Sequence, residues 1–546
     1  MTGRRVAVVS AAARGIGAAA RWLACDDWAV GALAELAPPP GSTLPNGFAV
    51  ELAEDVHRSR DGRLMLGGSP PRLLRLSKPA ARVLEPGRFT VTDAATAALA
   101  RRLVDIGVAL PRPPAQPVRD VTIVIPVRDR ARLLDQLLTA LSTDPETSGV
   151  PALVVDDGSL NCAAVASVTR LHGATLLVHP HNQGPAAARN TGLRHARTEY
   201  VAFCDSDVLP EPGWLSPLLA QFTDPALALA APRVAGIPQS QPGWLDRYED
   251  VRSPLDMGGR EAPIVPLSAL AYVPSATLIV RRAAVGGGFA PELRIGEDVD
   301  LCLRLHRAGW RMRYVPSSRV GHCHRANLRS WLAQRASYGS SAAQLARRHP
   351  GQVPPLNAAP WSVAACLLML RGRPVPLGVA AALTAGAAIR LIRRIPDADT
   401  PVRAGALLTL AALRGTAEQL TQCATRHYWP VAALAVVMNR RARRVLITAA
   451  AIEALVDYRR SRLPLNPLMY LLIRRLDDVA YGAGLWRGVI RDRTTAPLIP
   501  RLALRASAGT TGYSASARIR PVHRLVPPYR AALRPDNPVT DIGAWR

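Results

Sequence analysis

Lysines, aromatic residues and acidic residues are scarce in this sequence. Lys78 is the only lysine, so the 68 Lys and Arg residues are almost all arginine; they exceed the 41 Asp and Glu residues and give a net charge of +27. Such an excess indicates anionic partners, such as nucleic acids, anionic lipid headgroups or phosphorylated small molecules. Aromatic residues make up 5% of the chain and form no series on which bases could stack, which argues against a nucleic-acid-binding protein.

Paired cysteines and long apolar runs are also missing. The 7 cysteines are odd in number and widely scattered, which argues against a disulfide framework or a zinc ribbon and favours a reducing compartment. The N-terminus has no apolar segment with a cleavage site, and the uncharged apolar stretches 374–389, 404–413 and 429–438 are shorter than the roughly 20 residues that span a bilayer. We expect a cytoplasmic protein, in which the run YWPVAALAVVM, followed by NRRARR, suits a helix lying on the inner face of the cell membrane.

Two short units precede the main body of the chain. Residues 1–40 resemble the first βαβ unit of a short-chain dehydrogenase, but Ala11 replaces the first glycine of the turn and no Tyr-x-x-x-Lys pair follows, so we interpret them as a truncated remnant. Residues 45–115 are expected to form a small α+β domain, with a hairpin turn at Asp61-Gly62 and a helix capped by Thr92-Asp93. This pattern resembles the PqqD-like domains that grip peptides, although a packing module would show the same pattern.

Strand and helix patterns alternate between residues 119 and 350. The apolar runs VTIVIPV, ALVVDDGS, TLLVHP and YVAFCDSD, separated by helical segments, predict an α/β domain whose mostly parallel sheet binds ligands at the carboxyl ends of its strands. Residues 357–500 are predicted to be helical, and residues 501–546 to be disordered.

The predicted strand ends carry residues suited to a sugar nucleotide. Asp205 and Asp207 supply the hard oxygen ligands that Mg²⁺ or Mn²⁺ prefers, and the cation would in turn bind a diphosphate. Gly184 would let the backbone approach a ligand, and Arg189 on the following helix favours phosphate. The carboxylates that close the other strands could accept hydrogen bonds from a base and a ribose.

A second acidic motif opens a later helix. Three acids occur among the four residues of Glu297-Asp298-Val299-Asp300, which is more than the favourable interaction with the helix dipole requires. One of them is a candidate for the base that deprotonates an acceptor hydroxyl.

Together these motifs resemble the family 2 glycosyltransferases of the GT-A fold over about residues 119–345. The resemblance implies an inverting transfer with Asp298 as the first choice for the catalytic base and Glu297 as the second. It implies a metal site at Asp205 and Asp207, with His322 or His324 as a late ligand, of which we select His324. It also implies a donor site formed by residues at the strand ends, namely Pro126, Asp129, Asp157, Gly184, Arg189 and Asp205.

A closer resemblance covers about residues 45–500. The runs LGGSPPRLLRLS, SYGSSAAQLARRHPG and RRLDDVAYGAGLWRG are similar to the glycosyltransferases of the mycofactocin system. That resemblance implies a nucleotide-sugar donor, expected to be a UDP-hexose, and β-1,4-linked glucose units added to a small redox cofactor derived from a peptide. Asp477 and Asp478 in the third run follow two arginines, and we interpret them as ion-pair partners rather than metal ligands.

Two alternative functions are a nucleotidyltransferase and a membrane-associated glycosyltransferase. A nucleotidyltransferase would need a glycine-rich phosphate loop after the first strand, where PVRDRARLL has no glycine. The alternative within the same chemistry is a membrane-associated glycosyltransferase acting on a lipid or polysaccharide acceptor. A membrane-embedded synthase of that kind would need spanning helices and a QxxRW motif, which Gln334-Arg335 matches only loosely.

Overall fold

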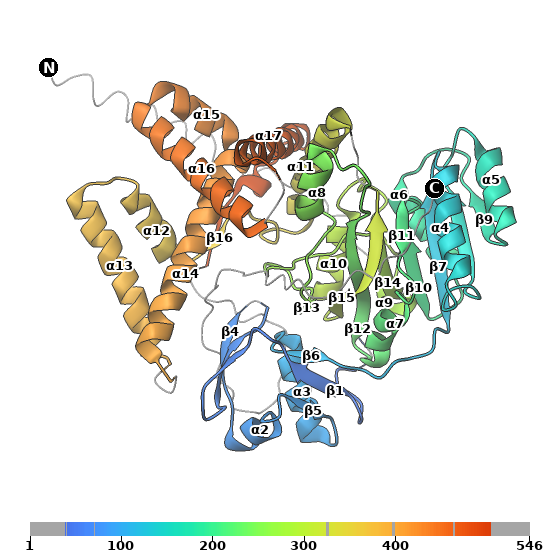
Figure 1. Ribbon diagram of the computed structural model, residues 1–546, viewed down its shortest axis with the longest axis horizontal. Helices are drawn as coiled ribbons and strands as arrows, with labels where there is room; N and C mark the ends of the chain where they lie inside the picture. Colours follow the sequence, from blue (N-terminus) through green and yellow to red (C-terminus); the bar gives the residue numbers. More distant parts are fainter. Residues whose placement is uncertain are drawn as a thin grey trace. The chain divides into compact units, whose positions relative to one another are not determined.

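The computed structural model describes residues 39, 41–69, 71–323, 327–395, 399–461 and 465–503 (Figure 1). All of these residues belong to one unit, which begins at Leu36. The dehydrogenase-like segment 1–40 lies, apart from residue 39, outside the described residues, and so do His324 and the chain from residue 504 onward.

The first described part is a small α+β domain. A three-stranded antiparallel sheet has the order β5-β1-β6, with β1 (Ala49–Leu52), β5 (Arg88–Thr90) and β6 (Ala109–Pro111). A second sheet consists of β2 (His57–Arg58), β3 (Leu64–Gly67) and β4 (Arg72–Arg75), and the helices are α2 (Lys78–Val83) and α3 (Ala94–Asp105).

Both local signals predicted for this domain are confirmed. Strands β2 and β3 form the antiparallel hairpin, and Gly62 in its turn has a φ of 68°, a conformation that glycine adopts without strain. The side chain of Asp93 accepts a hydrogen bond of 2.8 Å from the backbone N–H of Thr96 and caps α3.

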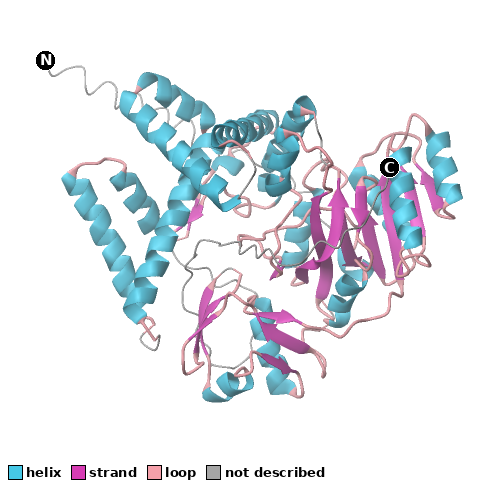
Figure 2. Cartoon of the chain, viewed as in Figure 1, coloured by secondary structure: helices cyan, strands magenta, loops and turns pink. Residues whose placement is uncertain are grey.

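The central part is a 9-stranded mixed sheet with helices on both faces (Figure 2). Its order is β11-β15-β12-β14-β10-β7-β8-β9, with β13 paired to β15. The strands are β7 (Val121–Val127), β8 (Ala152–Asp156), β9 (Thr175–Val178), β10 (Tyr200–Cys204), β11 (Val208–Pro210), β12 (Leu227–Gly236), β13 (Ala262–Pro263), β14 (Thr277–Arg281) and β15 (Arg311–His322). The helices are α4 (Ala131–Thr143), α5 (Cys162–Leu171), α6 (Pro185–His195), α7 (Ser216–Ala220), η1 (Gln221–Thr223), α8 (Trp244–Arg252), α9 (Arg282–Val285) and α10 (Glu297–Arg307).

The parallel core of this sheet is buried on both faces. Strands β10, β7, β8 and β9 are parallel neighbours, and all seven residues of β7 are buried. Because side chains alternate along a strand, Val124 packs in one core cluster with Leu193 of α6, while Ile123 packs in another with Leu134 of α4. This arrangement explains the continuous apolar runs in the sequence and brings the carboxyl ends of the strands to one edge.

The remaining described residues are mainly helical. The helices are α11 (Leu328–Arg348), α12 (Pro360–Met369), α13 (Pro374–Ile392), α14 (Pro401–Gln422), η2 (Cys423–His427), α15 (Trp429–Met438), α16 (Arg440–Ser461), α17 (Pro467–Arg491) and η3 (Ala496–Leu498). Two-residue strands β16 (Asn357–Ala358) and β17 (Arg501–Leu502) pair in parallel. The expectation of disorder from residue 501 is therefore wrong for Arg501 and Leu502, whose backbone is held by this pairing.

The expected lengths of the apolar segments also need one correction. Helix α13 continues past the apolar stretch 374–389 through Arg390 to Ile392, since arginine does not interrupt a helix. Its 19 residues, with a mean hydropathy of 1.8, make it the one helix in the described part of the chain that is long and apolar enough to cross a membrane.

Helices α11 and α17 pack with their backbones almost in contact. A Cβ atom added to Gly484 would lie 1.7 Å from the carbonyl oxygen of Ala336, and one added to Gly339 would lie 1.9 Å from that of Tyr481. The runs SYGSSAAQLARRHPG and RRLDDVAYGAGLWRG thus form the two sides of one interface, in which glycine is required by space rather than by conformation.

Ion pairs join the small domain to the sheet domain. Arg101 of α3 forms a two-pronged ion pair with buried Asp224, at 2.7 and 2.6 Å. Arg311 at the start of β15 forms another with Asp105, at 2.7 and 2.9 Å. These ion pairs hold the small domain at the N-terminal ends of β12 and β15.

Candidate active site

A large cavity of about 2860 Å³ lies where the parallel strands end. The ends of β7, β8 and β10 reach it, as do the first residues of α6 and α10. Most of the predicted site residues line it, namely Pro126, Asp157, Gly184, Arg189, Asp205, Asp207, Glu297 and Asp298. The topology thus brings together motifs that are up to about 170 residues apart in the sequence.

Arg189 connects the two acidic motifs. Its Nη2 donates a hydrogen bond of 2.6 Å to Oδ1 of Asp205, and its Nη1 donates one of 2.9 Å to Oε1 of Glu297. The guanidinium also lies 5.4 Å from the ring centroid of Phe289 and is almost fully buried. Arg189 was predicted to bind phosphate; in this structure both of its terminal nitrogens instead hold carboxylates.

The Asp-x-Asp carboxylates lie beside basic side chains. Oδ2 of Asp207 is paired with Arg130 and lies 3.7 Å from Nε2 of His322. Burial and the nearby charge of Asp207 raise the pKa of Asp205 to about 6, against the opposite effect of Arg189. The charge of Asp207 thus disfavours the ionised form of Asp205, and a cation placed between the two carboxylates would be electrostatically favoured.

The chemistry of these side chains fits a divalent cation that is shared with a ligand. Among residues 41–323 and the other described segments, no group of three or more His, Cys, Asp and Glu side chains could hold a metal ion. Mg²⁺ is commonly bound by one or two carboxylates together with substrate phosphates, which matches the pair Asp205 and Asp207. His322 is the histidine that the structure places beside Asp207, whereas the predicted His324 lies outside the described residues.

Asp129 and Asp157 hold loops. Oδ1 of Asp129 accepts a hydrogen bond of 2.6 Å from the N–H of Leu160, and Asp129 is not among the residues that line the cavity. The carboxylate of Asp157 accepts hydrogen bonds from the N–H groups of Gln183 (2.9 Å) and Gly184 (2.8 Å) and lies 2.8 Å from Nδ1 of His179. Asp157 therefore fixes the conformation of the loop that precedes α6, and it also lines the cavity.

Glu297 and Asp298 are adjacent but differ in their surroundings. Glu297 is buried and accepts hydrogen bonds from Arg189 and from Oγ of Ser275, the latter at 3.2 Å. Asp298 accepts from the backbone N–H groups of Ser275 (3.3 Å) and Val299 (2.7 Å). Burial and the charge of Glu297 raise the pKa of Asp298 to about 7. This difference favours Asp298 over Glu297 as a group that exchanges a proton near neutral pH.

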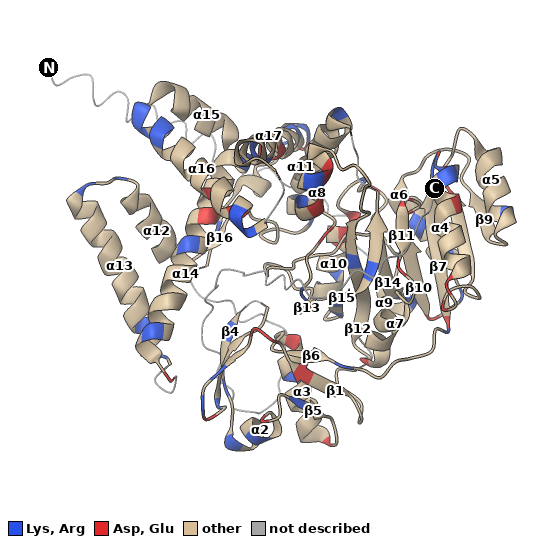
Figure 3. Cartoon of the chain, in the orientation of Figure 1, with Lys and Arg blue, Asp and Glu red and all other residues tan. Residues whose placement is uncertain are grey.

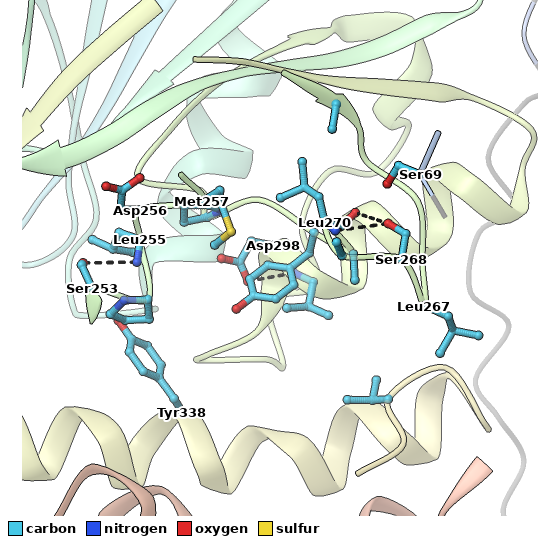
Figure 4. A pocket seen from close by; sticks show the side chains of 18 of the residues that line it. Ser69, Ser253, Leu255, Asp256, Met257, Leu267, Ser268, Leu270, Asp298 and Tyr338 are labelled. Atoms are coloured by element: carbon cyan, nitrogen blue, oxygen red, sulfur yellow. Dashed lines mark hydrogen bonds between the residues drawn. The ribbon is translucent and has the colours of Figure 1, made fainter. Parts of the chain in front are cut away.

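Asp298 faces the interior of the cavity. Figure 4 shows its carboxyl group near the side chains of Met257 and Leu270, on the opposite side of the pocket from Tyr338 of α11. Tyr272 also lines the cavity, and burial together with the charge of Asp298 raises the pKa of its hydroxyl. The base candidate thus lies in a partly apolar environment of the kind that raises a carboxyl pKa.

Asp300, the third acid of the motif, has a structural role. It is fully buried and lies within 3.0 Å of a nitrogen of each of Arg304, Arg348 and His349. Although burial acts in the opposite direction, these partners hold the pKa of Asp300 well below its ordinary value. Asp300 therefore anchors α10 to the end of α11.

The pair Asp477 and Asp478 is structural, as predicted. Asp478 accepts a hydrogen bond of 2.8 Å from Arg474, and Asp477 lies 3.1 Å from Nε of Arg335. The hydroxyl of Tyr248 donates a further hydrogen bond of 2.9 Å to Asp477. These contacts fix α17 against α11 and α8.

Four side chains that line the cavity were given no role from the sequence: Arg130, Ser275, Tyr272 and Tyr338. Arg130 lies three residues after the end of β7, and its position close to a strand end was a usable signal. The other three come from a loop and from a helix in the C-terminal region, and no spacing in the sequence relates them to Asp298.

Comparison with known proteins identifies the class and then the family. The model of glycosyl transferase family 2 matches residues 122–284, which contain the β7, β8 and β10 strand ends. The sheet domain is therefore a family 2 glycosyltransferase of the GT-A fold. A pre-mycofactocin glycosyltransferase of Mycobacterium tuberculosis is 45% identical over 472 residues, which cover 84% of this chain and 98% of that protein. The chain belongs to the family of pre-mycofactocin glycosyltransferases.

More distant relatives match a smaller part of this chain. The putative polypeptide N-acetylgalactosaminyltransferase 13 of Drosophila melanogaster is 27% identical over 240 residues, which cover 39% of this chain and 43% of that protein. Among solved structures, the mannosyltransferase PcManGT of Pyrobaculum calidifontis in complex with GDP-Man and Mn²⁺ is 20% identical, with a TM-score of 0.34, over 66% of this chain and 89% of that one.

Proposed function

We propose that the protein is an inverting, metal-dependent hexosyltransferase that transfers glucose from a UDP-sugar to a small peptide-derived precursor of a redox cofactor. The growing oligosaccharide is β-1,4-linked. One observation carries the proposal: the Asp-x-Asp pair and Asp298 line the same cavity of about 2860 Å³, which has room for a nucleotide sugar and an acceptor together. The Mycobacterium tuberculosis relative, which matches 84% of this chain, carries pre-mycofactocin in its name, and this supports the choice of acceptor.

Asp205 and Asp207 would hold Mg²⁺ or Mn²⁺ together with the diphosphate of the donor, and His322 would be a further ligand. When bound, the cation supplies positive charge that stabilises the departing nucleoside diphosphate. Gly184, at the start of α6, has a φ of 96° and presents its backbone to the cavity, so the donor diphosphate would lie beside the first turn of that helix.

Asp298 acts as the general base. Its carboxylate accepts the proton of the acceptor hydroxyl while the hydroxyl oxygen forms a bond to the anomeric carbon of the sugar. The bond between that carbon and the diphosphate oxygen breaks on the opposite face, its electron pair leaves with the nucleoside diphosphate, and the configuration inverts. Arg189 and Ser275 are positioning residues. Arg189 and the hydroxyl of Ser275 donate hydrogen bonds to Glu297, and the backbone N–H of Ser275 donates one to Asp298.

The small N-terminal domain contributes to the acceptor end of the cavity. His57, Arg58 and Leu66 on β2 and β3 line the same cavity as Asp298. The likeness of residues 45–115 to domains that grip peptides is in keeping with an acceptor derived from a peptide. We place the reaction in the cytoplasm, since the six cysteines among the described residues are free thiols, as expected in a reducing compartment.

A donor screen tests this function. The full chain is incubated with UDP-, GDP- or TDP-glucose, Mn²⁺ or Mg²⁺, and the peptide-derived acceptor, and mass spectrometry records hexose additions. We expect additions with UDP-glucose that disappear with a chelator and in the Asp298→Asn variant. Transfer to a lipid extract but not to the peptide-derived acceptor would refute the acceptor assignment and favour a membrane-associated glycosyltransferase with a lipid or polysaccharide acceptor.

A further inference from the structure

Helices α13 and α15 expose an unusual amount of apolar surface. Only 11% of the most apolar window of α13 is buried, and its buried residues are Ala380 and Leu391. Helix α15 has the sequence WPVAALAVVM and contains no buried residue. Val375, at the start of α13, is 75% exposed, and Val437, at the end of α15, is 78% exposed. Apolar patches of this kind mark a surface that binds a partner or a membrane.

The ends of these two helices meet. The guanidinium of Arg441, at the start of α16, donates a hydrogen bond of 3.0 Å to the carbonyl oxygen of Leu370 and another to that of Arg371. The turn between α12 and α13 therefore lies against the turn between α15 and α16. We call this joint end the basic tip; it consists of the exposed residues Leu367, Leu370, Arg371, Arg373, Val375, Val437, Met438, Arg440, Arg441, Arg443 and Arg444.

The charges of the basic tip are all positive. Residues 354–396 and 419–452 contain no aspartate or glutamate. Figure 3 accordingly shows arginine without neighbouring acidic residues at the α12–α13 turn and at the start of α16. Alternating arginine and apolar side chains on an exposed turn match an anionic bilayer surface, where the apolar groups enter the headgroup boundary and the guanidinium groups meet the phosphates.

Other occupants of this surface fit less well. A second copy of the chain would bring two sets of six arginines together, and the resulting repulsion would oppose association. A membrane-spanning α13 would have to separate from α12 and α14, against which it packs, and α14 carries Arg403, Arg414 and Glu418. A peripheral contact through the basic tip requires no such rearrangement.

We propose that the basic tip docks the enzyme on an anionic lipid bilayer without spanning it. The membrane then holds the enzyme through α12, α13, α15 and α16, none of which contributes a residue to the lining of the cavity with Asp298. The proposal does not depend on which sugar or acceptor the enzyme uses. It also differs from the sequence-based expectation, since the docking surface is the joint end of two helical hairpins rather than one helix lying flat.

Flotation with lipid vesicles tests the proposal. The full chain is mixed with vesicles of phosphatidylcholine alone or with 30% phosphatidylglycerol, and the protein that floats is measured at low and high salt. We expect at least tenfold more bound protein on the anionic vesicles, with release by high salt. Equal binding to both kinds of vesicle, or no binding to either, would overturn the proposal.

Two sets of variants locate the contact. Val437→Glu with Met438→Glu, and separately the triple change of Arg440, Arg443 and Arg444 to Ser, should each reduce binding at least tenfold. The matched controls change exposed residues outside the basic tip. Leu171→Glu, where the leucine is 76% exposed, controls for the added glutamates, and a triple change of Arg82, Arg170 and Arg197 to Ser controls for the lost arginines. Circular dichroism and sugar transfer to a soluble acceptor verify that the variants fold. Retention of binding in both tip variants, resistance of bound protein to carbonate, or a dimer that the tip variants dissociate would each contradict peripheral lipid docking.

Discussion

Replacing Asp298 with asparagine tests the assignment of the catalytic base. The change keeps the size of the side chain and one of the two oxygens that accept hydrogen bonds from Ser275 and Val299, and it removes the group that takes up a proton. General-base catalysis contributes about 10²- to 10⁴-fold to a rate, so kcat should fall by that factor. In the wild-type enzyme, transfer should rise as the pH increases through about 7, because the base is active only when ionised.

The same substitution should make the protein more stable at alkaline pH. The folded state raises the pKa of Asp298 from 3.8 to about 7, so its contribution to stability is complete below about pH 4 and is lost as the pH rises through 7. The full difference corresponds to about 4 kcal/mol. We discount it to about 1–3 kcal/mol, because the side chain is only partly buried and solvent screens its charge. Asparagine carries no charge, so at pH 8 the variant avoids the free energy that the wild type loses by burying an ionised Asp298. At pH 5 Asp298 is already protonated, so the difference in stability between the two proteins should be smaller.

Two measurements on purified protein test the predicted loss of activity and the predicted change in stability. Thermal unfolding at pH 5 and pH 8 compares the wild type, Asp298→Asn and the control Glu85→Gln, which neutralises an exposed carboxylate of the small domain. Initial rates of hexose transfer between pH 5.5 and 8.5 give the activity of the same proteins. If Asp298→Asn transferred sugar at a near-normal rate, or if it were no more stable than wild type at pH 8, the environment that we describe for Asp298 would be wrong.

The other predictions concern the metal site and the packing of the helical region. Asp207→Ala should abolish transfer without lowering the unfolding temperature by more than a few degrees, and calorimetry should show that the heat of UDP binding in Mn²⁺ is lost; normal binding heat would refute a metal site at Asp207. Gly484→Ala should lower the free energy of unfolding by about 1–3 kcal/mol, because the added Cβ would lie 1.7 Å from a backbone oxygen, whereas Gly386→Ala has open space and should be neutral or slightly stabilising. Equal stability of the two glycine variants in denaturant unfolding would contradict the close α11–α17 packing.

The parts of the site that sequence predicts well are those fixed by local structure. A buried strand followed by acids, as in ALVVDDGS and YVAFCDSD, determines both the strand and the place where it ends. The parallel order of the sheet then brings these ends together. For this reason the residue pattern alone assigns Asp157, Asp205 and Asp207 to one edge of the sheet, and all three line one cavity.

Contacts between distant segments could not be predicted in this way. Arg189 looks like a phosphate ligand at the start of a helix, but its partner Glu297 lies 108 residues further along the chain. The acid Asp129 fits a donor contact by position, yet its backbone has a φ of 54° and its side chain caps the N–H of Leu160. Sequence supplies residue type and approximate position, while the direction of a side chain depends on neighbours from other elements.

The distinction between Glu297 and Asp298 shows how such neighbours set the chemistry. Both acids begin the same helix, and both would gain equally from its dipole. Arg189 reaches Glu297 from α6, where Gly192 lets the helix pack against Val124 of β7; a Cβ at that glycine would lie 2.2 Å from the valine side chain. The guanidinium thus compensates the charge of Glu297, and Asp298 is left with backbone donors and a buried like-charged neighbour. In the proposed reaction Glu297 fixes the geometry and Asp298 exchanges the proton, and this division of tasks would depend on the packing of α6 against β7.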